Sequence, residues 1–98
     1  MFTEKIRELR KRNQLPQRSL AAALDIDTAT YCKIEKGERN AKKEQVETLA
    51  NILKVNPKDL LSLWLADKVT NIVSKEQSIA GNALSLATKE IRKKRLNA

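Results

Sequence analysis

Apolar side chains recur three or four residues apart along most of this chain, which is the spacing of amphipathic helices. In the first such stretch, residues 2–13, Phe2, Ile6 and Leu9 fall on one face. Pro16 follows, and a proline is well tolerated in the first turn of a helix because its missing N–H would have no partner there. The pattern therefore predicts a helix over residues 2–13 and a second helix starting at Pro16.

Two short helices joined by a tight turn are predicted between residues 17 and 37. Leu20 and Leu24 lie at helical spacing in the first, and Tyr31 and Ile34 lie at helical spacing in the second. A helix, a short turn and a second helix in this order form the helix-turn-helix motif, whose second helix enters the major groove of DNA.

The residues around this turn suit its geometry. Ile26 is an apolar plug between two aspartates. Asp27 is a good N-cap, because its carboxylate can accept from the free N–H groups at the start of the next helix. Gly37 is a suitable C-cap, because glycine adopts the left-handed conformation without a steric penalty. These residues predict that the second helix runs from Thr28 to Lys36.

Two more helices are predicted beyond a polar loop. The first covers residues 43–53, with Leu49 on its apolar stripe. The second has a strong start, since Asn56 can serve as N-cap and Pro57 can occupy the first helical position. Its apolar positions continue, so we expect this fifth helix to be long and to end near Val73.

A sixth helix is predicted over residues 75–95. Ser74 followed three residues later by Gln77 has the pattern of a capping box, which would start this helix. Gly81 weakens the helix by ~1 kcal/mol relative to alanine. Its apolar stripe consists of Ala80, Leu84, Ala87 and Ile91. The whole pattern predicts an all-α fold.

Composition narrows the function. The chain has 98 residues, a formal net charge of +8 and a pI near 9.9, which favour a polyanionic partner. Its single cysteine, Cys32, and its lack of histidine exclude an intramolecular disulfide, a cysteine-based zinc site and histidine-based catalysis. We therefore expect no metal, no cofactor and no enzymatic activity. The N-terminus has no apolar signal region and no stretch is long enough to span a membrane, so a cytoplasmic protein is expected.

The chain resembles the Xre-like helix-turn-helix family, which includes the lambdoid phage repressors and Cro proteins. The resemblance covers about Ile6 to Leu61 and is carried by Ile6, Leu9, Arg10, Gln17, Leu20, Ala21, Ile26, Ile34, Glu35, Lys36, Gly37, Leu49, Ala50, Leu53, Asn56, Pro57 and Leu60. The family usually has glycine where Asp25 stands, and aspartate tolerates that backbone better than most residues. The resemblance implies a five-helix lambda-repressor-like domain, residues 1–66. The long fifth helix and the added sixth helix would then supply a C-terminal extension, residues 67–98.

The resemblance also implies which side chains meet DNA. Base contacts fall on Thr28, Ala29 and Lys33, and Cys32 lies on the same exposed face. Lysine can donate to guanine, and threonine or alanine can contact the methyl group of thymine. The alternative is that this face is only solvated. The family also uses the glutamine that is Gln17 here to contact phosphate. Basic residues near the motif are further expected phosphate contacts: Arg18, Lys36, Arg39, Lys42 and Lys43. Thr30 is expected to contact phosphate or to cap locally.

Two structural roles complete the prediction. In the family the position of Arg10 pairs with that of Glu35, and the alternative is a solvated surface charge. A small helix-turn-helix domain reads few base pairs, so a dimer is expected. The expected dimer interface consists of Trp64, Ile72, Leu84, Ala87 and Ile91. The alternative for the sixth helix is that it folds back within its own chain.

Cys32 has two interpretations. Its oxidation would add bulk or charge in the groove and so act as a redox switch. The other interpretation is a small, tolerated surface residue.

The sequence thus predicts a dimeric transcriptional regulator that binds double-stranded DNA at a two-fold symmetric operator. One alternative is an antitoxin that binds a toxin protein and regulates its own promoter. A basic three-helix RNA binder is disfavoured, because the chain has too few aromatic residues to stack on bases.

Overall fold

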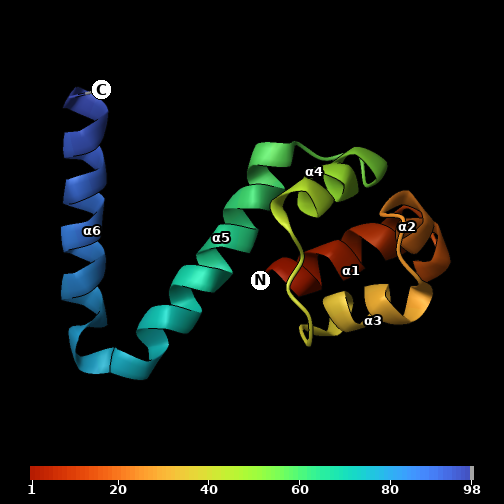
Figure 1. Cartoon of the computed structure of the whole chain (residues 1–98), viewed down its shortest axis with the longest axis horizontal. Coiled ribbons are helices and arrows are strands. Elements are labelled where there is room, and N and C mark those ends of the chain that lie inside the picture. The colour runs from red at the N-terminus through yellow and green to blue at the C-terminus, as the bar shows by residue number, and fades with distance from the viewer. Residues whose placement is uncertain (98) are drawn as a thin grey trace. The chain divides into compact units, whose positions relative to one another are not determined.

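Helices make up most of the structure, a computed structural model that describes residues 1–97 (Figure 1). No strand occurs in these residues. The helices are α1 (Phe2–Arg12), α2 (Gln17–Ala23), α3 (Thr28–Lys36), α4 (Lys43–Ile52), α5 (Pro57–Val73) and α6 (Gln77–Asn97), with a 3-10 turn, η1 (Ser74–Glu76), between the last two. The predicted all-α fold, with a long fifth helix and an added sixth helix, is confirmed.

The first compact unit is Met1–Asp67, and it encloses the hydrophobic core. Within it α3 packs against α1 and α2, and α2 packs against α4 (Figure 1). Each of these helices buries one apolar stripe, as the periodicity predicts. The buried side chains of this core are Phe2, Ile6, Leu9, Leu20, Ala21, Tyr31, Ile34, Ala41, Val46, Leu49, Ala50, Leu53 and Leu60.

Local capping determines where several of these helices begin and end. The Asn56 side chain accepts a hydrogen bond from the Lys58 amide at 2.9 Å, so the predicted start of the fifth helix is confirmed. The Gln45 side chain accepts from the Lys42 amide at 2.8 Å at the start of α4. The Asp67 carboxylate joins the N-terminus to the fifth helix, because it accepts from the Phe2 amide at 2.9 Å and lies 3.6 Å from the Met1 ammonium.

The second compact unit begins at Lys68 and contains the last turns of α5, η1 and α6. Side chains of α6 from Gly81 to Leu96 are exposed, and Ala80 is half-buried. No core comparable to that of the first unit forms among the described residues of this unit. The apolar stripe of α6 is therefore left uncovered by its own unit.

The predicted capping box at Ser74 is wrong. Ser74 makes no cap hydrogen bond, and its hydroxyl instead donates to the Asn71 carbonyl at 3.3 Å. Val73 and Gln77 both have right-handed helical backbone angles, so the chain passes through η1 without the extended residue that an N-cap requires. The sixth helix consequently begins at Gln77 rather than Lys75, and it extends to Asn97 rather than ending at Arg95.

Candidate nucleic-acid interface

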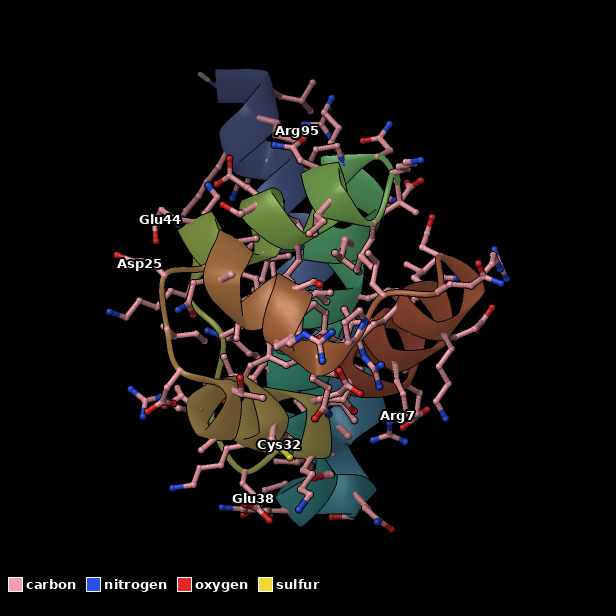
Figure 2. All side chains as sticks on the ribbon, turned by 90° about the vertical axis from the view of Figure 1, so that its right-hand side faces the viewer. Arg7, Asp25, Cys32, Glu38, Glu44 and Arg95 are labelled. Carbon is pink, nitrogen blue, oxygen red and sulfur yellow. The ribbon has the colours of Figure 1, made fainter. Side chains whose placement is uncertain are left out.

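The turn between α2 and α3 is held by backbone hydrogen bonds and one half-buried apolar side chain. The Asp25 amide donates to the Ala22 carbonyl at 3.1 Å, and the Ile26 amide donates to the Ala21 carbonyl at 3.0 Å. Ile26 packs against the core, as predicted, while the Asp25 side chain points away from the ribbon (Figure 2). Asp25 has φ of 56°, the left-handed conformation in which the family usually has glycine. The turn therefore forms with aspartate in place.

Both ends of α3 carry the predicted caps. The Asp27 carboxylate accepts a hydrogen bond from the Thr30 amide at 2.7 Å. Hydrogen bonds from Thr30 lower the pKa of Asp27 below its ordinary value, so the cap stays ionised at neutral pH. Gly37 ends the helix with φ of 81°, and its amide donates to the Ile34 carbonyl at 3.1 Å. These caps set the length of the exposed helix that could enter a DNA groove.

One face of α3 is buried and the opposite face is open to solvent. Tyr31 and Ile34 lie in the core. Thr28, Ala29 and Lys33 are exposed. The predicted base-contacting side chains therefore share the outer face of α3, where a threonine hydroxyl, a methyl group and an ammonium group can reach a ligand.

Cys32 lies beside this face and is half-buried, with its sulfur drawn on α3 in Figure 2. Thr30 is also half-buried, and its amide is engaged by the Asp27 cap. Both residues consequently offer less surface to a ligand than Thr28 or Lys33 does.

Exposed cations surround the α2–turn–α3 segment. Each of the basic residues predicted to contact phosphate is exposed, and they come from α2, the end of α3, the following loop and the start of α4: Arg18, Lys36, Arg39, Lys42 and Lys43. Gln17 differs from them, because it is half-buried and its amide nitrogen donates to Glu35 Oε1 at 3.5 Å. Only the remaining atoms of the Gln17 amide are available to a phosphate.

A buried ion pair fixes the last turn of α3 against α1. The Arg10 guanidinium donates from Nη2 to Glu35 Oε1 at 2.8 Å and from Nε to Glu35 Oε2 at 3.0 Å. The Glu35 side chain is 3% exposed and that of Arg10 is 13% exposed. Arg10 also donates from Nη1 to the Leu15 carbonyl at 3.1 Å, so one side chain links α1, α3 and the segment before α2. This arrangement positions α3 in the domain.

Burial and pairing shift the pKa values of both residues in this pair. Burial alone would raise the pKa of Glu35, but the hydrogen bonds from Arg10 and the positive charge of Arg10 together bring that pKa below its ordinary value. The hydrogen bond to Glu35 likewise raises the pKa of Arg10. Burial raises the pKa of the neighbouring Tyr31, so its phenol stays protonated. Glu35 is thus a buried carboxylate that keeps its charge because Arg10 faces it.

Sequence reasoning missed two further contacts that support this surface. Arg7 of α1 donates to the backbone carbonyl of Glu35 at 3.1 Å, which is one of the last carbonyls of α3 without a partner inside the helix. The Trp64 indole N–H donates to the Ala41 carbonyl at 2.8 Å and so anchors the loop between α3 and α4. Each pairs residues far apart in the chain, and no local pattern marks them.

The residues predicted at a dimer interface differ in exposure. Trp64 is half-buried against the core of its own unit. Ile72 is 74% exposed, Leu84 is 40% exposed and Ile91 is 59% exposed. Ala87 is exposed as well. Three large apolar side chains are therefore open to water.

The described part of the chain contains no cluster of histidine, cysteine, aspartate and glutamate that could hold a metal ion. Among the same residues, no helix has both the length and the apolar character needed to cross a membrane.

Comparison with known proteins gives the family. A helix-turn-helix family model matches residues 6–60. The transcriptional repressor RstR of the cryptic phage CTXphi, from Vibrio cholerae, is 38% identical over 78 residues, which cover 80% of this chain and 67% of the relative. The control protein C.BamHI, from Bacillus amyloliquefaciens, is 34% identical over 62 residues, which cover 62% of this chain and 76% of the relative.

No solved structure matches the chain significantly. The matched residues 6–60 run from α1 into α5 and include the α2–turn–α3 segment with its capped and exposed α3. The chain therefore belongs to the Xre-like helix-turn-helix family.

Proposed function

We propose that this protein is a sequence-specific transcriptional regulator that binds double-stranded DNA as a homodimer at a two-fold symmetric operator. The observation that carries the proposal is the exposed face of α3, Thr28, Ala29 and Lys33, held in place by the Arg10–Glu35 pair and bordered by cations. The names of the relatives, a transcriptional repressor and a control protein, support regulation as the role.

In this mechanism α3 lies in the major groove with its N-terminal residues on base edges. Lys33 would donate to guanine O6 or N7, and Thr28 would hydrogen-bond a base or touch a thymine methyl. Ala29 can offer only apolar contact, which also suits thymine. Cys32, half-buried at the edge of the same face, would make the weakest base contact.

Phosphate contacts would fix the domain on the duplex. The exposed cations of α2, α3, the loop and α4 can neutralise backbone phosphates: Arg18, Lys36, Arg39, Lys42 and Lys43. Gln17 and Thr30 would add hydrogen bonds through the atoms that their internal contacts leave available. Because each neutralised phosphate releases counterions, affinity should fall steeply with salt.

In this proposal residues 1–66 bind DNA and residues 67–98 form the dimer. The exposed apolar residues Ile72, Leu84, Ala87 and Ile91 support this division. Trp64 would contribute less to this interface, because its half-buried side chain packs against its own core. Binding to a promoter would control transcription in the cytoplasm, without a cofactor or catalysis.

Selection of bound duplexes from a random DNA pool tests this function. The expected result is one shared motif with two-fold symmetry, whose half-sites lie about one DNA turn, ~34 Å, apart. A matched control is the same selection with Thr28→Gly and Lys33→Ala together, which should return weaker or different preferences. A pool that yields no shared sequence with the unchanged protein would contradict sequence-specific binding, and a single asymmetric site would contradict the dimeric form.

A further inference from the structure

The α6 helix carries an apolar row that is largely exposed. Ala80, Leu84, Ala87 and Ile91 follow one another at spacings of four, three and four residues, the spacing of a coiled-coil seam. Leu84 is 40% exposed and Ile91 is 59% exposed, although both belong to a well-formed helix. A row of this kind is buried in other proteins by a second helix.

The row alternates small and large side chains, and this alternation is complementary to itself. When two copies of α6 run antiparallel about a two-fold axis between residues 85 and 86, Ala80 faces Ile91 of the other copy. Leu84 then faces Ala87 of the other copy, so every layer pairs a small residue with a large one. Equal layers of this kind allow two helices to keep a constant separation, as close packing requires.

A parallel pair would instead place each residue of the row opposite the same residue of the other copy. Ala80 would face its own copy and leave a gap, while Leu84 would face its own copy and push the helices apart. Successive layers would therefore need different separations between two straight helices. Packing alone favours the antiparallel arrangement.

Charge favours the same orientation. Residues 77–88 of α6 carry no charged side chain. The C-terminal part of the helix carries one acid, Glu90, and five bases: Lys89, Arg92, Lys93, Lys94 and Arg95. A parallel pair would set the two basic segments side by side, where like charges repel, whereas an antiparallel pair sets each one beside uncharged helix. Opposed helix dipoles add to this preference.

We propose that α6 pairs antiparallel with α6 of a second copy of this chain through Ala80, Leu84, Ala87 and Ile91. This inference rests on the dimer of the proposed function and gives it an orientation and a set of contacts. A second copy suits the row because the same pattern serves as both partners of a two-fold, isologous contact.

Disulfide trapping in the full chain tests the orientation. Ala80→Cys and Ile91→Cys are made separately, each with Cys32→Ser to remove the native thiol. The two variants are then mixed and oxidised with copper phenanthroline. In the antiparallel pair, residue 80 faces residue 91 of the other copy, so the mixture should give a disulfide-linked dimer that contains one chain of each variant.

Each variant alone is the matched control. In the antiparallel pair, two copies of residue 80 are offset along the helices by roughly 11 × 1.5 Å, about 16 Å. This offset exceeds the ~7 Å limit between the Cα atoms of a disulfide, so neither variant should link to itself. Self-linking of Ala80→Cys would overturn the proposal in favour of a parallel pair.

A second pair of variants tests the residues. Leu84→Lys should turn the dimer into a monomer in sedimentation at micromolar concentration, because it places like charges close to the axis. Leu84 is already exposed in the single chain, so this change should not unfold it. Leu86→Lys, on the neighbouring row of the same helix and 67% exposed, should leave the dimer intact.

The remaining outcomes separate this proposal from the proposed function. A dimer that survives Leu84→Lys and shows no trapping between residues 80 and 91 would place its interface elsewhere and overturn the pairing alone. An unchanged chain that is monomeric would overturn both the pairing and the dimer, and would leave the row to a different protein. Sequence-selective binding by that monomer would still preserve the assignment of α3 to base recognition.

Discussion

The two compact units of this protein have helices with similar apolar stripes, but only the first unit buries them. In the first unit Leu49 is fully buried, whereas in the second unit Leu84 is 40% exposed. Both leucines lie inside helices with apolar stripes. The difference is the number of neighbouring helices, since α4 has α2 beside it while α6 stands without a core of its own. An apolar stripe therefore predicts that a helix will be covered, but not by which chain.

The largest effect expected from this contrast comes from truncating one leucine in each unit. Leu49→Ala should lower the free energy of unfolding by ~2–5 kcal/mol, because it leaves a cavity in a packed core. Leu86→Ala should change it by less than ~0.5 kcal/mol, because the side chain is already in water. Urea unfolding followed by circular dichroism measures both. Equal losses for the two variants would mean that α6 is also part of a core.

The buried ion pair gives the next effect. Glu35→Ala should destabilise the first unit by ~3 kcal/mol, the lower end for breaking a buried pair, because Arg10 keeps its contact with the Leu15 carbonyl. Glu47→Ala, an exposed acid on α4, is the control and should stay within ~0.5 kcal/mol. An unfolding midpoint that Glu35→Ala does not move would show that the pair contributes nothing to stability.

The same carboxylate should make stability depend on pH. Because the pKa of Glu35 is lowered on folding, its contribution is present above the unfolded value of about 4.5 and is lost as the pH falls through the folded value. The difference in stability between the unchanged protein and Glu35→Gln should therefore be largest near neutrality and should shrink below pH 4.5. A difference that grows on acidification would have the wrong sign for this pair.

What the sequence could predict follows from the range of each interaction. The caps at Asp27, Gly37 and Asn56 act within a few residues, so the pattern located them and the structure contains them. The capping box at Ser74 failed because η1 carries the helical backbone directly from Val73 to Gln77. The pattern could not reveal that no cap was needed there.

Contacts between residues far apart in the chain could be predicted only where the family resemblance supplied the pairing. The resemblance pointed to Arg10 with Glu35, and the structure joins them at 2.8 Å. Nothing pointed to the contacts of Arg7 with the Glu35 carbonyl or of Trp64 with the Ala41 carbonyl, which depend on how helices pack. The base and phosphate contacts stay predictions, because they require DNA.

The side chains that contact DNA should come from the first unit, and removing two cations there can show this. Lys33→Ala should relax preference at one base pair by ~1–3 kcal/mol. Arg39→Ala should weaken binding to all sequences alike and flatten the salt dependence. Neither change should alter the sedimentation of the free protein. Binding curves on a selected and a scrambled duplex at several salt concentrations measure the difference. Equal losses on both duplexes for Lys33→Ala would show that it does not read a base.

The smallest expected effects come from replacing one glycine by alanine in each unit. Gly37→Ala should destabilise the first unit by ~1 kcal/mol, because φ of 81° disfavours any residue with a Cβ. Gly81→Ala should instead strengthen α6 by ~1 kcal/mol, because alanine is the better helix former.

A Cβ at either position meets no tight contact, since the nearest atom to one at residue 37 is the Thr3 methyl carbon at 3.9 Å and none lies within 4 Å at residue 81. The opposite signs would therefore come from the backbone alone. Urea unfolding reports the first change, and amide hydrogen exchange along residues 77–97 reports the second. Loss of protection in α6 on Gly81→Ala would mean that the absence of a side chain at residue 81 is itself required, as it would be if another helix approached closely there.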